Sequence, residues 1–276
     1  FEHMGLDSGP KGKWDLKPWS LKDIKEIISK WQIKLHQKGW NSLYLNNHDQ
    51  PRMVSRFGDN TQYRVESAKM LATLLHTLQG TPFIYQGEEI GMTNAAFDSI
   101  EQYRDVETLN MYREAVIKGG ADPEKIMMAI KAKSRDNART PMQWDDSEHA
   151  GFTTGEPWIA VNPNYKEINV KQALADKNSI FYYYQKLIKL RKEHPAIVYG
   201  DYRLILEDDD QIFSYVRRLE NQQLLVILNF FKEKAHFYFP NTVQFRTKEL
   251  LISNYEVNDN QIDHIELKPY EARVYL

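Results

Sequence analysis

The sequence contains no cysteine. Disulfides, thiolate metal sites and cysteine nucleophiles are therefore excluded, and a reducing cytoplasm is a compatible location. No apolar run approaches the roughly 18 residues that span a bilayer, so we expect no membrane segment. Neither sign of charge dominates: 36 Lys and Arg face 38 Asp and Glu, a net charge of −2. This balance gives no reason to expect nucleic acid or a membrane surface as a partner.

Several enzyme signatures are also missing. The chain has no phosphate-binding glycine loop and no nucleophile elbow. Its eight histidines show no close metal-ligand spacing, so we expect no metal site. Aromatic residues, in contrast, are abundant at 12%. Rings of this kind stack on sugar faces, but they fill a hydrophobic core equally well, and composition alone leaves both interpretations open.

The first part of the chain alternates between helical and strand-like patterns. Helical spacing of apolar residues predicts helices over 20–39, with Ser20 as N-cap, and over 65–78. Short apolar runs at 42–45 and 82–85 follow these helices and predict buried strands. Helices and strands that alternate through short links predict a parallel sheet with covering helices, only partly contained in this chain.

Residues 91–178 differ, because they are rich in Asn, Asp, Gly and Pro and contain one helical stretch near 123–133. A long turn-rich segment inside a compact protein is usually functional. A further helix is predicted over 179–193. Beyond Pro195 the period becomes two, which predicts a domain boundary near residue 196 and a small antiparallel sandwich. Its strands are expected near 202–206, 211–217, 223–230, 235–239, 248–252, 262–267 and 271–276.

Three polar clusters are candidates for chemistry. Asn47-His48-Asp49 follows a predicted strand, where a carboxylate can stabilise developing positive charge and His48 can donate to a hydroxyl; the alternative is an ordinary turn. Arg135-Asp136-Asn137-Ala138-Arg139 offers guanidinium donors for a polar ligand, or an ion-pair network that holds the loop down. Residues 86–89, QGEE, are better explained as the acidic start of a helix.

Four motifs resemble the α-amylase superfamily, glycoside hydrolase family 13. Residues 43–52, LYLNNHDQPR, resemble its fourth conserved region, and residues 80–91, GTPFIYQGEEIG, resemble the segment that follows. Residues 135–145, RDNARTPMQWD, and 150–153, AGFT, are similar to bacterial oligo-1,6-glucosidases. The motifs occur in the family's order, and the resemblance covers essentially the whole chain.

The resemblance implies a fold in which this chain holds the C-terminal part of a (β/α)8 TIM barrel, followed by a small antiparallel β-sandwich. Residues 1–195 would be the barrel part, with a long insertion at about 91–178, and 196–276 the sandwich. Residues 1–6 would be the end of strand six, 42–47 strand seven and 81–86 strand eight.

The resemblance also implies the roles of four residues. Asp49 corresponds to the carboxylate that stabilises the transition state, and His48 would hydrogen-bond the same sugar. Arg135 matches the arginine that binds the terminal glucose, and Gln50 would touch the neighbouring sugar. No organic cofactor is implied. The implied reaction is exo-acting, retaining hydrolysis of α-1,6 bonds in isomaltose and isomalto-oligosaccharides, in the cytoplasm.

The family's nucleophile and acid/base lie on strands that this sequence does not contain. We therefore expect the chain to be a C-terminal fragment, inactive by itself, that pairs with or derives from an enzyme with an N-terminal part; the alternative is a truncated reading frame. Rival activities are α-1,4-glucosidase, trehalose-6-phosphate hydrolase and sucrose isomerase. The stretch 3–9, HMGLDSG, lacks the arginine-rich segment of sucrose isomerases and favours hydrolysis. A non-catalytic, amylase-like binding or scaffold protein is the rival from another class.

Overall fold

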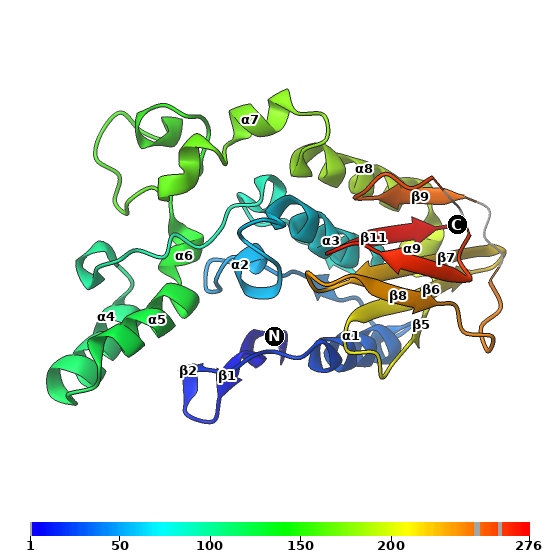
Figure 1. Ribbon diagram of the computed structural model, residues 1–276, viewed down its shortest axis with the longest axis horizontal. Coiled ribbons are helices and arrows are strands. Elements are labelled where there is room, and N and C mark those ends of the chain that lie inside the picture. Colours follow the sequence, from blue (N-terminus) through cyan, green and yellow to red (C-terminus); the bar gives the residue numbers. More distant parts are fainter. Residues whose placement is uncertain (1, 246–248, 259–260) are drawn as a thin grey trace. The chain divides into compact units, whose positions relative to one another are not determined.

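A computed structural model of the chain describes every residue except Phe1, 246–248 and 259–260. The chain forms two compact units, each assembled from three stretches of sequence. Unit 1 comprises Phe1–Pro18, Leu45–Phe57 and Ile84–Phe181. Unit 2 comprises Trp19–Tyr44, Gly58–Phe83 and Tyr182–Leu276. Because the chain passes repeatedly from one unit to the other, residues far apart in sequence meet within each of them (Figure 1).

Unit 2 contains the predicted β-sandwich. A five-stranded antiparallel sheet has the order β5-β6-β7-β11-β9, and β10 and β8 form a second, two-stranded sheet. A hydrophobic core that includes Val216, Ile227, Phe237 and Ile265 draws side chains from both sheets, which therefore pack face to face. All seven predicted strands are confirmed, although residue 248 of the run at 248–252 lies outside the described residues. Their bounds are β5 (Asp201–Ile205), β6 (Ile212–Leu219), β7 (Gln222–Asn229), β8 (Ala235–Tyr238), β9 (Leu250–Ser253), β10 (His264–Leu267) and β11 (Ala272–Tyr275).

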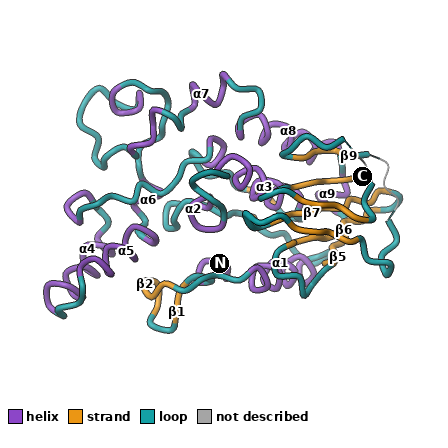
Figure 2. The backbone as a smooth tube through the Cα atoms, viewed as in Figure 1, coloured by secondary structure: helices purple, strands orange, loops and turns teal. Residues whose placement is uncertain are grey.

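Strands β6 and β7 are buried on both faces, because helices cover the side of the five-stranded sheet that does not face β8 and β10. Six consecutive residues of each strand are buried instead of alternating with exposed ones. Helices α3 and α9 contact these strands, and α1 contacts β5 (Figure 2). The helices are α1 (Leu21–Leu35), α3 (Arg64–Thr77), α8 (Ile180–Glu193) and α9 (Pro195–Tyr199).

The helix signals in the sequence are confirmed in unit 2. The Ser20 hydroxyl accepts a hydrogen bond from the Asp23 amide at 3.1 Å, as expected of an N-cap. The helix ends at Leu35, earlier than the predicted Gly39, because Gly39 closes a turn by donating to the Leu35 carbonyl. Helix α3 begins and ends within one residue of the predicted range.

In the part of the chain that the structure describes, the predicted parallel sheet is represented by one short pair. Strands β3 (Ser42–Leu43) and β4 (Thr81–Pro82) pair in parallel, and the Phe83 amide donates to the Leu43 carbonyl at 2.8 Å. Both strands are shorter than the predicted 42–47 and 81–86. Gly80, at φ +137°, precedes β4 so closely that an added Cβ would lie 2.6 Å from the Asn41 carbonyl oxygen, and only glycine fits there.

Unit 1 is mostly loops and short helices. Its only described sheet is the hairpin of β1 (Ser8–Gly9) and β2 (Gly12–Leu16). Glu2–Gly5 form a 3-10 helix rather than the predicted end of a strand, and no described strand pairs with them; Phe1 lies outside the described residues. Helix α5 has the predicted bounds. The helices are α2 (Met53–Phe57), α4 (Val106–Tyr112), a π-helix (Arg113–Lys118), α5 (Pro123–Lys133), α6 (Asp136–Arg139) and α7 (Val170–Ala175), with 3-10 turns at Glu88–Ile90, Ile100–Gln102, Glu148–Gly151 and Pro163–Lys166.

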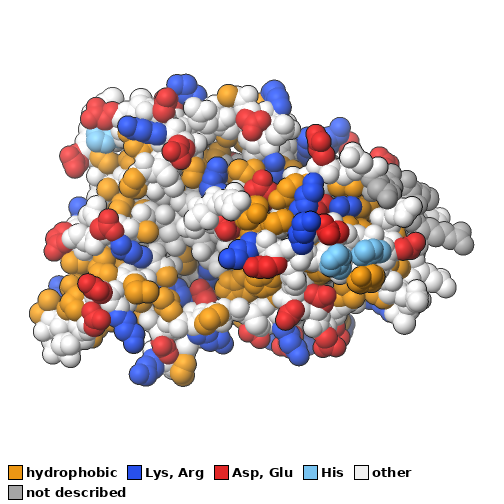
Figure 3. All heavy atoms as spheres, viewed as in Figure 1, with side chains coloured by type: hydrophobic (Ala, Val, Ile, Leu, Met, Phe, Trp, Pro, Cys, Tyr) orange, Lys and Arg blue, Asp and Glu red, His pale blue; other side chains and the backbone are white. Residues whose placement is uncertain are grey.

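The surface agrees with the balanced composition. On the face drawn in Figure 3, basic and acidic side chains are interspersed, without a large area of one sign. Among the described residues, none of the helices is both long and apolar enough to cross a bilayer.

His76, on α3, makes the stability of the fold depend on pH. Burial lowers its pKa from 6.5 to about 4; the Ala72 carbonyl, 2.9 Å from Nδ1, opposes this shift, and the nearby Arg191 adds to it. The unfolded chain takes up this proton near pH 6.5 and the folded chain only near pH 4. The free energy of unfolding should therefore fall as the pH drops from 6.5 towards 4. Urea denaturation at pH 7 and pH 5 measures this, and His76→Phe should reduce the difference. An equal pH dependence in the variant would contradict the prediction.

Candidate active site

Asp49 lies in a loop that is anchored on both sides. The Asn46 side chain donates to the Glu88 carboxylate at 2.7 Å and accepts from the Met53 amide at 2.6 Å. The Asp49 amide donates to the Asn47 side-chain oxygen at 2.8 Å, an Asx turn. This loop holds the backbone of Asp49 in place and leaves 42% of the side chain exposed.

The Asp49 carboxylate is held by two arginines and approached by a histidine. Arg139 Nη2 donates to Oδ1 at 2.8 Å, and Arg135 Nη1 lies 3.6 Å from the same oxygen. His48 Nε2 lies 3.3 Å from Oδ2. Arg139 Nε also donates to the His48 carbonyl at 2.9 Å, which ties the arginine to the loop itself. These contacts orient the Asp49 carboxylate while 42% of the side chain stays exposed.

Asp105 is the buried counterpart of Asp49, with 1% of its side chain exposed. Both of its carboxylate oxygens accept from Arg135 Nε at 3.1 Å. Burial would raise the pKa of the Asp105 carboxyl, but hydrogen bonds from Arg135 and Thr108 outweigh burial and lower it. The hydrogen bonds between Arg135 and Asp105 raise the pKa of Arg135. Arg135 therefore connects a buried carboxylate to an exposed one.

The one-turn helix α6 explains why both arginines point towards Asp49. Arg135 and Arg139 are four residues apart and so lie on the same face of the turn. Between them, Asp136 and Asn137 are buried, with 0% and 1% exposed. Asp136 accepts from the amides of residues 104 and 105, and Asn137 accepts from the Ala95 amide. One face of the turn anchors it, and the other presents the two cations.

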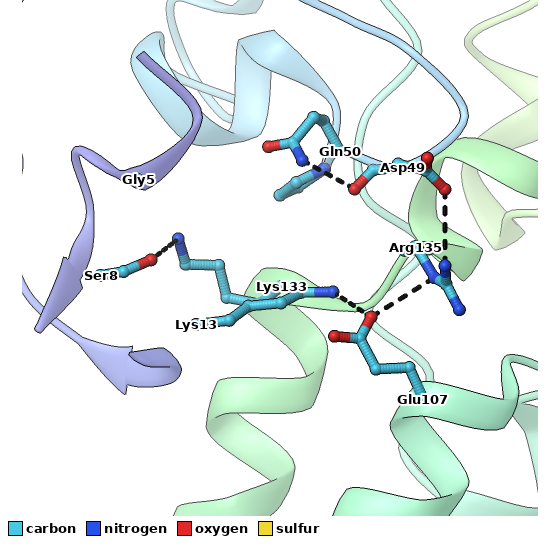
Figure 4. Close-up of a pocket in the computed structure, with 9 residues that line it drawn as sticks. Gly5, Ser8, Lys13, Asp49, Gln50, Glu107, Lys133 and Arg135 are labelled. Atoms are coloured by element: carbon cyan, nitrogen blue, oxygen red, sulfur yellow. Dashed lines mark hydrogen bonds and ion pairs between the residues drawn. The ribbon is translucent and has the colours of Figure 1, made fainter. Parts of the chain in front are cut away.

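A cavity of about 510 Å³ opens beside Asp49 (Figure 4). Lys13 Nζ donates to Glu107 at 2.7 Å, and Glu107 lies 3.4 Å from Arg135 Nε, so one edge of the cavity is a chain of alternating charges. Its lining residues are Gly5, Ser8, Lys13, Asp49, Gln50, Pro51, Glu107, Lys133 and Arg135. A polar cavity of this size with converging hydrogen-bonding groups suits a small polyhydroxylated ligand.

A second ionic cluster lies beneath the cavity. Asp7 accepts from Arg56 Nε at 3.0 Å and contacts Lys133 Nζ at 2.5 Å, and both cations are almost fully buried. Burial would raise the pKa of the Asp7 carboxyl, but hydrogen bonds from Arg56 and Lys133 lower it overall. Arg56 also donates to the Gln50 side-chain oxygen at 2.8 Å, and Gln50 donates to the Asp49 carbonyl at 2.8 Å.

The structure brings together all four residues that the sequence analysis selected. Asp49, Gln50 and Arg135 line the cavity, and His48 contacts Asp49. The Arg135–Arg139 motif was interpreted either as an ion-pair network or as a set of donors for a ligand. The structure shows features of both, because the two arginines form ion pairs with Asp49 and Arg135 also lines the cavity. Asp105 and Glu107 were missed. Asp105 carries one local signal, an Asp at the N-cap of α4, but its pairing with Arg135 is a tertiary contact.

The described residues include no group of three or more His, Asp and Glu that is arranged to hold a metal ion. The cavity is lined by carboxylates, cationic side chains and an amide, those of Asp49, Glu107, Arg135 and Gln50 among them. Such groups can bind hydroxyls and stabilise a cationic transition state.

Two family descriptions match nearly the whole chain. Residues 1–200 match the alpha amylase catalytic domain, and residues 202–274 match the maltogenic amylase C-terminal domain. The first match covers the helices, the β3–β4 pair and the cavity, and the second covers the sandwich. The chain belongs to the α-amylase family.

Individual relatives agree with this assignment. The chain is 66% identical to an oligo-1,6-glucosidase from Parageobacillus thermoglucosidasius over 276 residues, which is 100% of this chain and 49% of that protein. It is 63% identical to an oligo-1,6-glucosidase from Bacillus cereus, with the same coverage. The solved trehalose-6-phosphate hydrolase of Bacillus licheniformis superposes with a TM-score of 0.96 at 49% identity, covering 100% of this chain and 50% of that one. The chain thus spans about half the length of these relatives.

Because Asp7 lies between two buried cations in the cluster beneath the cavity, we expect its replacement to lower the free energy of unfolding considerably. Asp7→Asn would leave Arg56 and Lys133 buried beside a neutral amide, which should cost about 3 kcal/mol of unfolding free energy. Asp98→Asn is the matched control, because Asp98 contacts Lys131 at the same 2.5 Å but is 93% exposed, and should change stability little. Urea denaturation of both variants measures the difference. Equal effects would contradict the assigned role of burial.

Proposed function

We propose that this chain is part of a retaining, exo-acting α-glucosidase that hydrolyses the α-1,6 bonds of isomaltose and isomalto-oligosaccharides and releases glucose. The observation that carries the proposal is the position of Asp49, a carboxylate held by Arg135 and Arg139 at the edge of a polar cavity. Relatives named oligo-1,6-glucosidase, 66% and 63% identical, support the choice of substrate.

In the proposed mechanism the Asp49 carboxylate stabilises the positive charge that develops on the reacting sugar. Its Oδ1 is held by Arg139, and its Oδ2 is 3.3 Å from His48 Nε2, so the carboxylate is oriented before substrate binds. Arg135 binds a hydroxyl of the terminal glucose, His48 hydrogen-bonds the same sugar, and Gln50 contacts the neighbouring sugar. An oriented carboxylate needs little reorganisation when the charge forms.

Retaining hydrolysis requires a nucleophile and an acid/base, two carboxyl groups about 5 Å apart. We assign neither role to this chain. We propose that an N-terminal part of the same enzyme supplies both, and that the chain alone is inactive. Residues 1–195, with the insertion 91–178, would complete the barrel, and 196–276 would form the β-domain. The matches to residues 1–200 and 202–274 support this division.

We further propose that the enzyme acts in the cytoplasm on imported oligosaccharides. The absence of cysteine is compatible with a reducing compartment.

Glucose release by the full-length enzyme from isomaltose, maltose, sucrose and trehalose 6-phosphate tests the proposal. We expect isomaltose to give the highest kcat/KM. A preference for maltose would indicate an α-1,4-glucosidase, and a preference for trehalose 6-phosphate would indicate a trehalose-6-phosphate hydrolase. Conversion of sucrose without release of glucose would indicate a sucrose isomerase. No turnover of any of the four would favour a non-catalytic scaffold.

Asp49→Asn should lower kcat of the full-length enzyme on isomaltose by at least about 100-fold, because it removes the charge that stabilises the transition state. The amide keeps the size of the side chain, so the melting temperature should change little. Steady-state kinetics measure the effect, with Asp98→Asn as a control for loss of an acidic group elsewhere in unit 1. Turnover of Asp49→Asn near that of the unmodified enzyme would exclude the proposed role.

A further inference from the structure

Arg52 is a buried cation whose guanidinium hydrogen bonds go to backbone carbonyls. It lies three residues beyond Asp49, and 1% of its surface is exposed. Its guanidinium donates to three backbone carbonyls, those of Gln86 at 2.6 Å and of Asn137 and Ala138 at 3.2 Å. Among the described residues, no carboxylate forms an ion pair with it. The Tyr85 ring lies 5.3 Å from the guanidinium carbon.

Burying a charged guanidinium costs free energy of folding unless its hydrogen bonds are maintained. Burial lowers the pKa of Arg52 to about 10, and Tyr85, Glu88 and Glu89 partly offset this, so the side chain remains cationic at neutral pH. A buried guanidinium whose hydrogen bonds go to backbone carbonyls is stable only while those carbonyls stay in place. The position of Arg52 and the positions of the three carbonyls are therefore coupled.

Two of these carbonyls belong to α6, which presents Arg135 and Arg139. A helix of four residues is too short to be stable by itself, and the carbonyls of its last turn have no partner within the helix. Arg52 binds the carbonyls of Asn137 and Ala138, and the Tyr85 hydroxyl also donates to the Ala138 carbonyl, at 3.0 Å. External donors therefore determine where α6 ends.

The contacts form a closed loop. From Asp49 the backbone runs to Arg52, whose amide is held by the Asn94 side chain at 2.8 Å. The guanidinium of Arg52 binds the backbone of α6, and Arg139, the last residue of α6, returns to the Asp49 carboxylate at 2.8 Å. A shift of Arg52 would be transmitted to the distance between the arginines and Asp49.

We propose that Arg52 is a positioning residue that sets how Arg135 and Arg139 reach Asp49. Its effect on turnover rests on the proposed function, whereas its effect on geometry does not. The planar fork of an arginine donates to three carbonyls in different directions, which the single ammonium of a lysine cannot reproduce. Arg52→Lys should therefore keep the positive charge but lose the hydrogen bonds to the three carbonyls as a set.

Unit 2 offers a matched control in Arg217. It is 0% exposed, burial lowers its pKa to about 10, and it donates to the carbonyls of Thr77, Gly200 and Asp201 and to the Gln32 side chain. In the full-length enzyme, both Arg52→Lys and Arg217→Lys should lower the melting temperature. Well below both melting temperatures, only Arg52→Lys should lower kcat/KM on isomaltose, by about 10- to 100-fold. Equal losses in both variants would overturn the proposal.

A double-mutant cycle separates positioning from a general loss of order. In an Arg139→Lys background, Arg52→Lys should cause much less further loss of kcat/KM, because the group it positions is already altered. Fully additive losses would contradict the proposal. If Arg52→Lys does not fold, Tyr85→Phe removes a neighbouring bond to the Ala138 carbonyl and should show a smaller loss with the same dependence on Arg139.

A crystal structure of the Arg52→Lys enzyme gives a readout that does not require activity. The contact between Arg139 Nη2 and Asp49 Oδ1 should lengthen from 2.8 Å to beyond about 3.5 Å, the limit of a hydrogen bond. An unchanged contact would overturn the inference. If the unmodified enzyme hydrolyses none of the glucosides, the proposed function fails, while this distance still decides the role of Arg52.

Discussion

Two arginines one helical turn apart hold an exposed and a buried carboxylate together, and the geometry of the candidate site depends on these contacts. Asp105 neutralises Arg135 inside the protein, and Arg139 orients Asp49 at the cavity. Because the pairs share the short helix α6, the site has a defined geometry before any ligand binds. Such preorganisation is what electrostatic stabilisation of a cationic transition state requires.

Each unit contains a buried arginine that donates hydrogen bonds to backbone carbonyls. Arg52 and Arg217 are buried cations that donate to backbone carbonyls, and each joins segments distant in sequence. Loops and short helices have little stability of their own, so their positions are set by such bonds. In unit 2 the bonds support a sandwich that also has a large apolar core. In unit 1, two described apolar clusters, one around Ile90 and Met142 and one around Tyr103 and Ile130, accompany the polar contacts.

Elements with a strong local pattern were predicted well. The N-cap at Ser20, the helix Pro123–Lys133 and all seven strands of the sandwich follow from spacing, capping and alternation. Glu2–Gly5 were predicted as strand and form a 3-10 helix, since a strand needs hydrogen-bonded neighbours and no described strand provides them. Helices α2 and α4 were not predicted, because each is too short to show periodicity.

The sequence by itself determined the family, the sandwich and the four candidates Asp49, His48, Gln50 and Arg135, because these rest on local patterns and motifs. Only the tertiary structure decided that Arg135 pairs with Asp105, that Arg139 reaches Asp49, and that Arg52 binds α6. These contacts join residues 30 to 90 positions apart. The physical reason is that the sequence gives the charge of each side chain but not its partner. The partner depends on which backbone segments the fold brings within hydrogen-bonding distance.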